Sequence, residues 1–183
     1  MNKTAKAAAI VALGAALATA APTAAHAAGG GAGTVTVERG HALSCSGAAE
    51  GVSAYVELYE NSAYGAHANV VVETPSGEYG GGFGPETTSL FKRGSVQADV
   101  EIGPLGEEPA GDRYTLVVEG TYERAGRPER VDEVIEDAGQ RIVTKGRKSP
   151  LAAQVSVTVL GKTVPLSCDT AFAFDLVVRR TSL

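Results

Sequence analysis

Apolar and polar residues alternate with a period of two through most of the chain after residue 33, and helical periodicity is almost absent. β-Branched residues gather in the alternating stretches, and glycine, proline and aspartate separate them. This pattern is typical of strands joined by turns. We therefore predict strands over residues 34–38, 42–46, 54–59, 67–73, 89–93, 96–102, 114–123, 129–136, 141–145, 153–160, 163–167 and 171–179.

The predicted strands indicate an all-β fold. Because no long helix is available for parallel crossovers, we expect an antiparallel β-sandwich, with a β-barrel as the alternative. A helical turn over residues 131–137 is a local alternative to a strand there. Gly80–Gly84 is expected to be a flexible loop, since no Lys-Ser/Thr follows it as in a phosphate-binding loop. Leu160–Thr163 predicts a two-residue hairpin turn with Gly161 at its first central position.

The N-terminus has the three parts of a secretory signal peptide. Lys3 and Lys6 supply positive charge, an apolar run covers residues 7–18, and small residues end at Ala27. We expect cleavage after Ala27, with Ala20 as the alternative site, and therefore a secreted, extracellular protein. Residues 28–33 are expected to form a flexible Gly/Ala N-terminus and residues 34–183 a single domain. No later stretch is long and apolar enough to predict a membrane span.

Net charge argues against a nucleic-acid partner. The whole chain carries a formal charge of -5, and removal of Lys3 and Lys6 with the signal leaves 14 basic against 21 acidic residues, or -7. Nucleic-acid binding needs a basic face that neutralises phosphates. Basic residues do gather between Arg124 and Lys148, but acidic residues are interleaved with them. We interpret that segment as a solvated pair of strands.

Two cysteines, Cys45 and Cys168, follow the signal. In an exported protein an even number of cysteines favours a disulfide, because the oxidising compartment preserves it. We predict a Cys45–Cys168 bridge that ties the first strands to the last. A metal site would need more ligands at close spacing, and a redox pair is more often Cys-x-x-Cys.

Two segments resemble strands of immunoglobulin-like domains. His41–Ser46 is similar to a second strand carrying its cysteine, and Pro109–Leu116 is similar to a corner that places a tyrosine, here Tyr114, before a late strand. In such domains the tyrosine hydroxyl bonds to nearby backbone. Leu116 stands where the family has its second cysteine, and tryptophan is absent. The resemblance implies architecture alone, and the Ala-, Gly- and Val-rich composition resembles that of exported proteins of high-GC bacteria.

The chain is poor in residues for catalysis. His41 and His67 are the two histidines left after processing, neither has another histidine at close spacing, and no serine lies in a Gly-x-Ser-x-Gly motif. We therefore expect no metal, no cofactor and no serine hydrolase activity. Paired carboxylates of a glycosidase stay open, although an outward charged face explains the same residues. The candidates on predicted strands are Glu57, Glu60, Glu73, Glu101 and Glu119.

Aromatic residues concentrate between Tyr55 and Phe91, which hold six of the ten Phe and Tyr residues. Tyr55, Glu57 and Tyr59 share one strand face, opposite an aliphatic face that starts at Ala54. Rigid exposed rings favour binding, so we predict a surface here. The alternative is that the rings pair across strands or enter the core. The predicted surface comprises Tyr55, Glu57, Tyr59, Tyr64, Tyr79 and Phe83.

These observations favour a non-catalytic binding or interaction module that acts outside the cell or at the envelope. Its partner would be a protein or an envelope polymer. A structural or accessory cell-surface protein is the alternative. An enzyme inhibitor or a hydrolase is a further alternative, with residues 103–109 or 146–150 as the inhibitory loop. The sequence leaves the oligomeric state open.

Overall fold

The computed structural model describes residues 33–105 and 112–183, and every regular element in these ranges is a strand. The predicted signal peptide, the junction before Gly33 and the Pro109–Gly111 part of the predicted corner lie outside the described residues. Residues Gly31–Leu183 form one compact unit. The strands are β1 (Thr34–Ala49), β2 (Val52–Asn61), β3 (Gly65–Thr74), β4 (Gly77–Glu86), β5 (Phe91–Lys92), β6 (Ser95–Pro104), β7 (Tyr114–Arg124), β8 (Glu129–Asp137), β9 (Gln140–Val159) and β10 (Lys162–Ser182).

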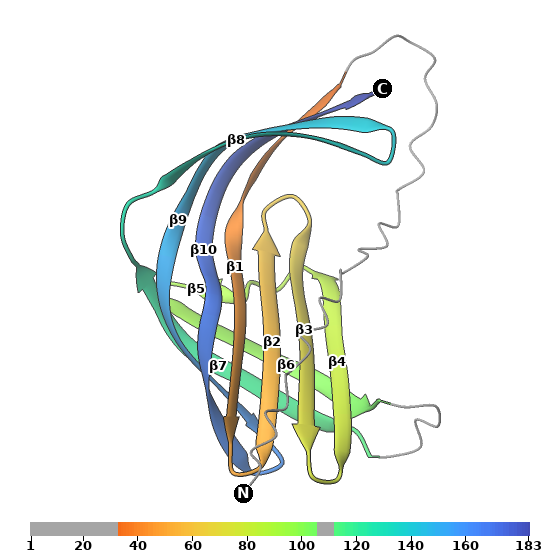
Figure 1. Cartoon of the computed structure of the whole chain (residues 1–183), viewed down its shortest axis with the longest axis vertical. Coiled ribbons are helices and arrows are strands. Elements are labelled where there is room, and N and C mark those ends of the chain that lie inside the picture. Colours follow the sequence, from red (N-terminus) through yellow and green to blue (C-terminus); the bar gives the residue numbers. More distant parts are fainter. Residues whose placement is uncertain (1–32, 106–111) are drawn as a thin grey trace, which may run out of the picture. The chain divides into compact units, whose positions relative to one another are not determined.

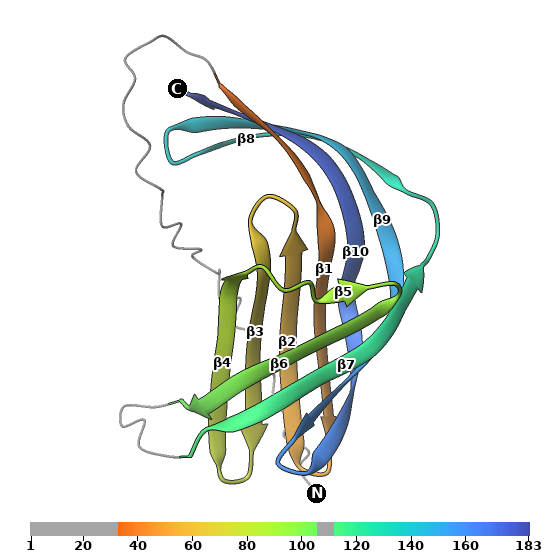
Figure 2. The same cartoon turned by 180° about the vertical axis from the view of Figure 1, so that it is seen from behind.

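All strands pair antiparallel in a single sheet, which confirms the all-β class. The order is β10-β1-β2-β3-β4-β6-β7-β9-β8, β5 pairs with β6, and β9 pairs with β10 as well as with β7. Figure 1 shows β10 and β1 to β4 side by side, with β6 and β7 crossing behind them. Figure 2 gives the reverse view, with β6 and β7 in front. The chain thus brings its first and last strands together.

Three strands are longer than the alternation predicted. The expected strands 34–38 and 42–46 are one strand, β1; 141–145 and 153–160 are one strand, β9; and 163–167 and 171–179 are one strand, β10. The pairing of β10 with β9 shifts its register between Leu166 and Phe172, and β10 continues as one strand across this irregularity. The helical alternative for 131–137 is wrong, because β8 covers it. Residues 146–150 lie inside β9 and form no inhibitory loop.

The expected loop at Gly80–Gly84 is also wrong, because these residues belong to β4. A side chain cannot fit at two of its positions. A Cβ atom on Gly81 would stand 2.0 Å from the carbonyl oxygen of Glu101, and one on Gly82 would stand 2.4 Å from that of Ala68. Glycine is therefore required by the close approach of backbones.

Four hairpins use the same turn, in which a non-glycine residue precedes a glycine and both have positive φ. The pairs are Glu50–Gly51, Arg93–Gly94, Ala138–Gly139 and Leu160–Gly161. Two positive φ values define the type I′ turn, whose twist matches that of the strands it joins. The turn after β9 was thus predicted correctly as a two-residue turn, but Gly161 occupies its second central position rather than the first.

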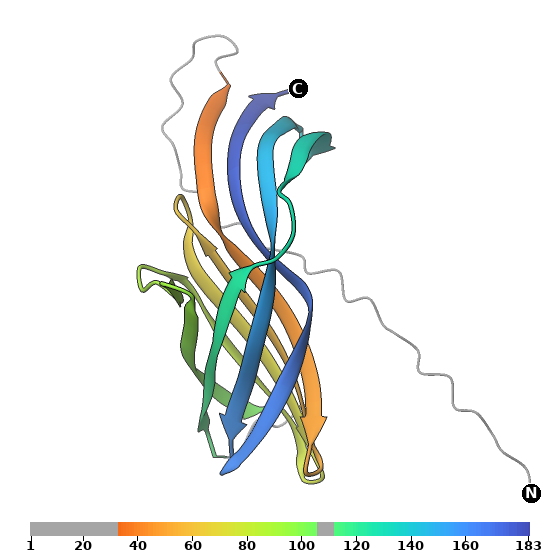
Figure 3. The same cartoon turned by 90° about the vertical axis from the view of Figure 1, so that its left-hand side faces the viewer.

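The core lies on the inward faces of these strands. Along β2 the burial alternates strictly, with Val52, Ala54, Val56 and Leu58 buried. β3, β6, β7 and β9 contribute further apolar side chains to the same cluster. The strands β1, β9 and β10 extend above the point where β7 ends, which Figure 3 shows in side view. The extended ends of β1, β9 and β10 therefore have no strands of β6 and β7 packed across them.

Within residues 33–105 and 112–183 no helix is long and apolar enough to cross a membrane.

Candidate functional site

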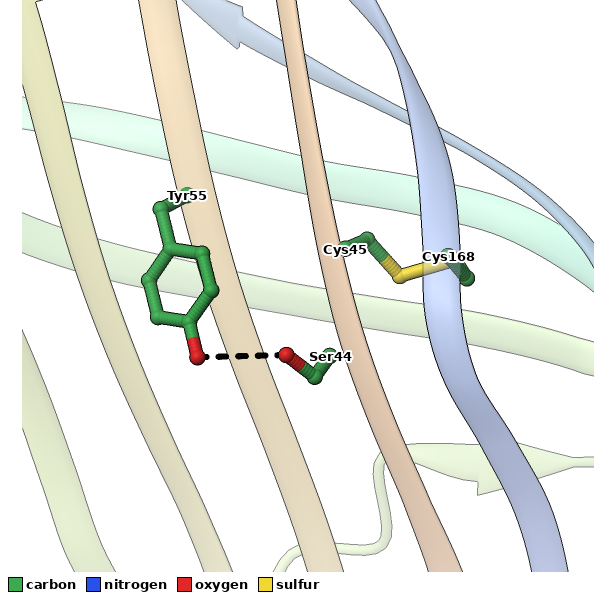
Figure 4. Close-up of a disulfide and its surroundings, with 4 residues drawn as sticks. All are labelled: Ser44, Cys45, Tyr55 and Cys168. Atoms are coloured by element: carbon green, nitrogen blue, oxygen red, sulfur yellow. Dashed lines mark hydrogen bonds between the residues drawn. A yellow bond between two sulfur atoms is a disulfide. The ribbon is translucent and has the colours of Figure 1, made fainter. Parts of the chain in front are cut away.

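The predicted face of β2 is exposed as expected. Tyr55 and Tyr59 are 37% and 36% exposed, while the aliphatic face is buried. The Tyr55 hydroxyl donates to Glu57 Oε1 at 2.6 Å and accepts from Ser44 Oγ at 3.1 Å. Figure 4 shows the bond to Ser44 on the neighbouring strand. The bond to Glu57 is the main cause that raises the pKa of Tyr55. The ring is therefore fixed in place on the outer surface.

Tyr59 is fixed in the same way by its neighbours. Asn61 Nδ2 donates to the Tyr59 hydroxyl at 2.6 Å, and the ring stacks on Phe174 of β10 with centroids 5.8 Å apart. Burial raises the pKa of Tyr59 despite that hydrogen bond. Tyr64, at the β2–β3 turn, lies beneath the guanidinium of Arg180 at 5.6 Å. Tyr55, Glu57, Tyr59 and Tyr64 thus lie along β2 and its turn.

A buried ion pair joins this surface to β1 and β10. Glu38 is 6% exposed, and its carboxylate accepts from Arg180 Nη2 at 3.0 Å and from Asn61 Nδ2 at 3.1 Å. Thr36 Oγ1 donates to the same carboxylate at 3.0 Å. Burial by itself would raise the pKa of Glu38, but these hydrogen bonds and the charge of Arg180 lower it overall. The group is fully partnered, so we assign it a structural role.

The structure places Tyr79 and Phe83 elsewhere. Both are half-buried and pack against the core, and the Tyr79 ring meets Tyr114 edge-on at 5.7 Å. Phe83 lines a cleft of about 480 Å³ together with Leu90 and Ala98. These aromatic residues do not join the surface on β2.

The predicted disulfide is confirmed. Cys45 and Cys168 are bonded, and they lie directly opposite each other on β1 and β10. Figure 4 shows the bridge between the two strands. Cys45 is 2% exposed, so the bridge belongs to the core.

The catalytic candidates do not converge. His41 stacks on Phe91 at 4.7 Å, and burial lowers its pKa although Glu60 opposes this. Glu60 Oε2 accepts from the backbone N–H groups of Leu90 and Phe91 at 2.6 and 3.2 Å, so it anchors the segment before β5. Glu101 pairs with Arg113. Within residues 33–105 and 112–183 there is no cluster of three or more His, Cys, Asp or Glu residues suited to a metal ion.

A different surface, which the sequence analysis missed, lies on the extended parts of β1, β8, β9 and β10. The side of β1 that carries Leu43 and Cys45 in the core carries Val37 and Val35 beyond it. These two valines are 52% and 54% exposed. The strand register places residues of β1, β10, β9 and β8 on this same face. The paired residues are Val37 with Val177, Val177 with Lys145, Val35 with Arg179, Arg179 with Val143, and Val143 with Val134.

Valines and basic residues are interleaved on this surface: Arg179 lies between Val35 and Val143, and Lys145 lies beside Val177. We name it the valine–arginine face: Val35, Val37, Val134, Val143 and Val177 with Arg39, Arg130, Arg141, Lys145, Arg147 and Arg179. Three acidic residues share it, Asp132, Asp175 and Glu136, so six cations leave a net charge of +3. Among the residues that the structure describes, Arg141, Arg147 and Arg179 have no ion-pair partner.

Comparisons with known proteins give little further information. No family model matches the chain, and no curated protein matches it. One similar solved structure is that of a protein provisionally named AttH from Nitrosomonas europaea, at 12% identity and a TM-score of 0.33. The match covers 80% of this chain and 51% of that one, so the chain spans about half the length of that protein. Similarity at this level defines neither the fold nor the function.

Proposed function

We propose that this chain is an exported, non-catalytic binding module that captures an anionic partner through the valine–arginine face. The observation that carries the proposal is the presence of four half-exposed valines on one face of the extended sheet, Val35, Val37, Val134 and Val177. Contiguous apolar surface on a protein outside its core commonly marks a binding site. A signal-like N-terminus and a disulfide are consistent with action outside the cell.

Charge supports an anionic partner. The predicted mature chain carries -7, yet the valine–arginine face carries +3. An acidic protein surface or an acidic envelope polymer would meet the three unpaired guanidinium groups of Arg141, Arg147 and Arg179. Planar guanidinium groups suit carboxylate and phosphate, which favours such partners. Contacts of this kind weaken as salt rises.

The test uses the exported, disulfide-bonded protein immobilised against culture fluid and envelope fractions of the producing cells. We expect a specific partner that is lost with Val177→Thr/Arg147→Gln and released by salt. The control Ile135→Thr/Arg113→Gln also replaces one exposed β-branched apolar residue with threonine and one arginine with glutamine, but outside this face, where Ile135 is 54% exposed. It is expected to retain the partner.

The same experiment distinguishes this proposal from binding through the β2 surface and from a structural or accessory role. Loss of the partner with Tyr55→Ala/Tyr59→Ala, but not with the valine and arginine changes, would move the binding site to the β2 surface predicted from the sequence. Absence of any captured partner from folded protein would contradict the binding role and favour the structural or accessory one.

A further inference from the structure

The extended sheet has two outer edges, and they differ in chemistry. Within the described ranges, no strand pairs with the outer side of β8 or with the first six residues of β1, since β2 joins β1 from Gly40 onward. Unpaired edges invite association with other strands, and proteins protect them with charged residues. Six of the nine residues of β8 are charged. Thr34–Val37 of β1 carries no charge at all.

The hydrogen bonds between Arg39 and Ser62 show which residues of β1 direct their backbone N–H and C=O groups to the outer edge. The Arg39 N–H donates to Ser62 Oγ at 3.0 Å, and the Arg39 carbonyl accepts from the Ser62 N–H at 2.8 Å. Both backbone groups of Arg39 therefore point to the outer edge. Alternate residues of an antiparallel strand direct their N–H and C=O groups to the same side. Val37 and Val35 thus present their backbone groups at this edge, and the β2–β3 turn closes the edge at Arg39.

From this edge we infer that two copies of the chain pair antiparallel through β1, with Val35 of each copy opposite Val37 of the other. This register uses both open residues of each edge and places Thr36 opposite Thr36 on the two-fold axis. Glu38 then faces Thr34, so no like charges oppose each other. A two-fold contact needs a self-complementary surface, and this uncharged edge is one. The sheets of the two copies become continuous, and so do their valine–arginine faces.

A β8 edge makes a poorer partner for itself. Its charged residues are mainly acidic, and two copies would bring like charges together. Pairing of β1 with β8 of another copy would leave one free edge at each end and form an open chain. The two-fold pairing of β1 alone removes the unprotected edge in a closed dimer.

Dimerisation of this kind does not require that the valine–arginine face binds a partner, and different variants test the two. Sedimentation velocity over a range of concentrations should show a reversible monomer–dimer equilibrium. Val37→Pro removes an edge N–H and leaves the β1–β10 ladder intact, because that N–H points away from β10. We expect it to weaken association by roughly tenfold or more, since each dimer loses two backbone hydrogen bonds.

Thiol cross-linking tests the register and does not depend on how Val37→Pro folds. Thr36→Cys should form a covalent dimer under mild oxidation, because residue 36 lies on the two-fold axis. Thr34→Cys is the matched control on the same edge, and it should link much more slowly since it faces Glu38. Peptide mapping checks that the Cys45–Cys168 bridge is retained. A wild-type monomer at every concentration, or equal linking by the two variants, would overturn the dimer and leave the proposed binding role untouched.

Discussion

Reduction of the Cys45–Cys168 bridge is expected to remove a large part of the domain's stability. The two cysteines are separated by 123 residues, so the bridge closes nearly the whole described domain into one loop. For a loop of this length the chain-entropy model gives roughly 5 kcal/mol. Residual structure in the reduced, unfolded chain lowers that figure. Single domains of ordinary stability have a free energy of unfolding of about 5–15 kcal/mol.

Because of the position of the bridge, the oxidised and reduced proteins can be compared with the same native strand pairing. Cys45 and Cys168 already oppose each other in the β1–β10 ladder, so reduction leaves the native pairing available. Cys45 is buried, and replacing it with alanine would also remove packing. The preferred perturbation is therefore reduction of the wild-type protein, with the thiols kept free by excess reductant, and Cys45→Ala/Cys168→Ala as a second variant.

Urea denaturation followed by circular dichroism measures the effect. We expect the reduced protein to lose about 3–5 kcal/mol, with little change in the native spectrum. A loss of less than about 1 kcal/mol, at an unchanged dependence on urea, would refute the loop-entropy reasoning. A lower stability with an altered native spectrum would mean that the bridge shapes the fold as well.

Three further predictions concern single residues. Arg180 and its neighbours lower the pKa of Glu38 below its ordinary value of 4.5. The stability that this carboxylate contributes is therefore complete above pH 4.5 and is lost as the pH falls through the lower folded-state pKa. Glu38→Gln should make stability fall less steeply with pH in acid denaturation curves. Leu160 is 42% exposed and has a positive φ of 51°, a conformation that asparagine adopts more readily than leucine. Leu160→Asn should therefore raise the free energy of unfolding in urea by about 0.5–1 kcal/mol, and a decrease would contradict backbone strain at this residue. A Cβ on Gly40 would stand 1.7 Å from the carbonyl oxygen of Glu60, so Gly40→Ala should destabilise by more than about 2 kcal/mol, measured by thermal unfolding.

The sequence predicted most of the fold because alternation is a local signal. It identified the buried face of β2 correctly, and the cysteines indicated which distant strands meet. It divided β10 at residues 168–170, where the strand shifts its register. It divided β1 and β9 because Gly40 and Gly146 resemble turns, although here they allow backbones to approach. It missed β4 for the same reason. The requirement for glycine at Gly81 comes from β6, which is distant in sequence.

The valine–arginine face was not predicted because its charges are mixed along the chain. Between Arg124 and Lys148 basic and acidic residues alternate, which suggested a solvated pair of strands. The register of β8 and β9 sorts them only in part: Arg130, Arg141, Lys145 and Arg147 share one face with Asp132 and Glu136, while Glu129, Glu133 and Asp137 lie on the other. Residues 141, 143, 145 and 147 read Arg, Val, Lys and Arg, and this period of two was the available signal.

Strand length decides that this face is exposed. On β1 the same side carries Leu43 under the crossing strands and Val37 and Val35 beyond them, and composition along the strand hardly changes. What changes is the partner layer, because β6 begins at Ser95 and β7 ends at Arg124 while β1, β9 and β10 continue. A valine there has the same local sequence signal as a core valine. Its exposure follows from the lengths of other strands, so the face and the open β1 edge beside it could be found from the assembled sheet alone.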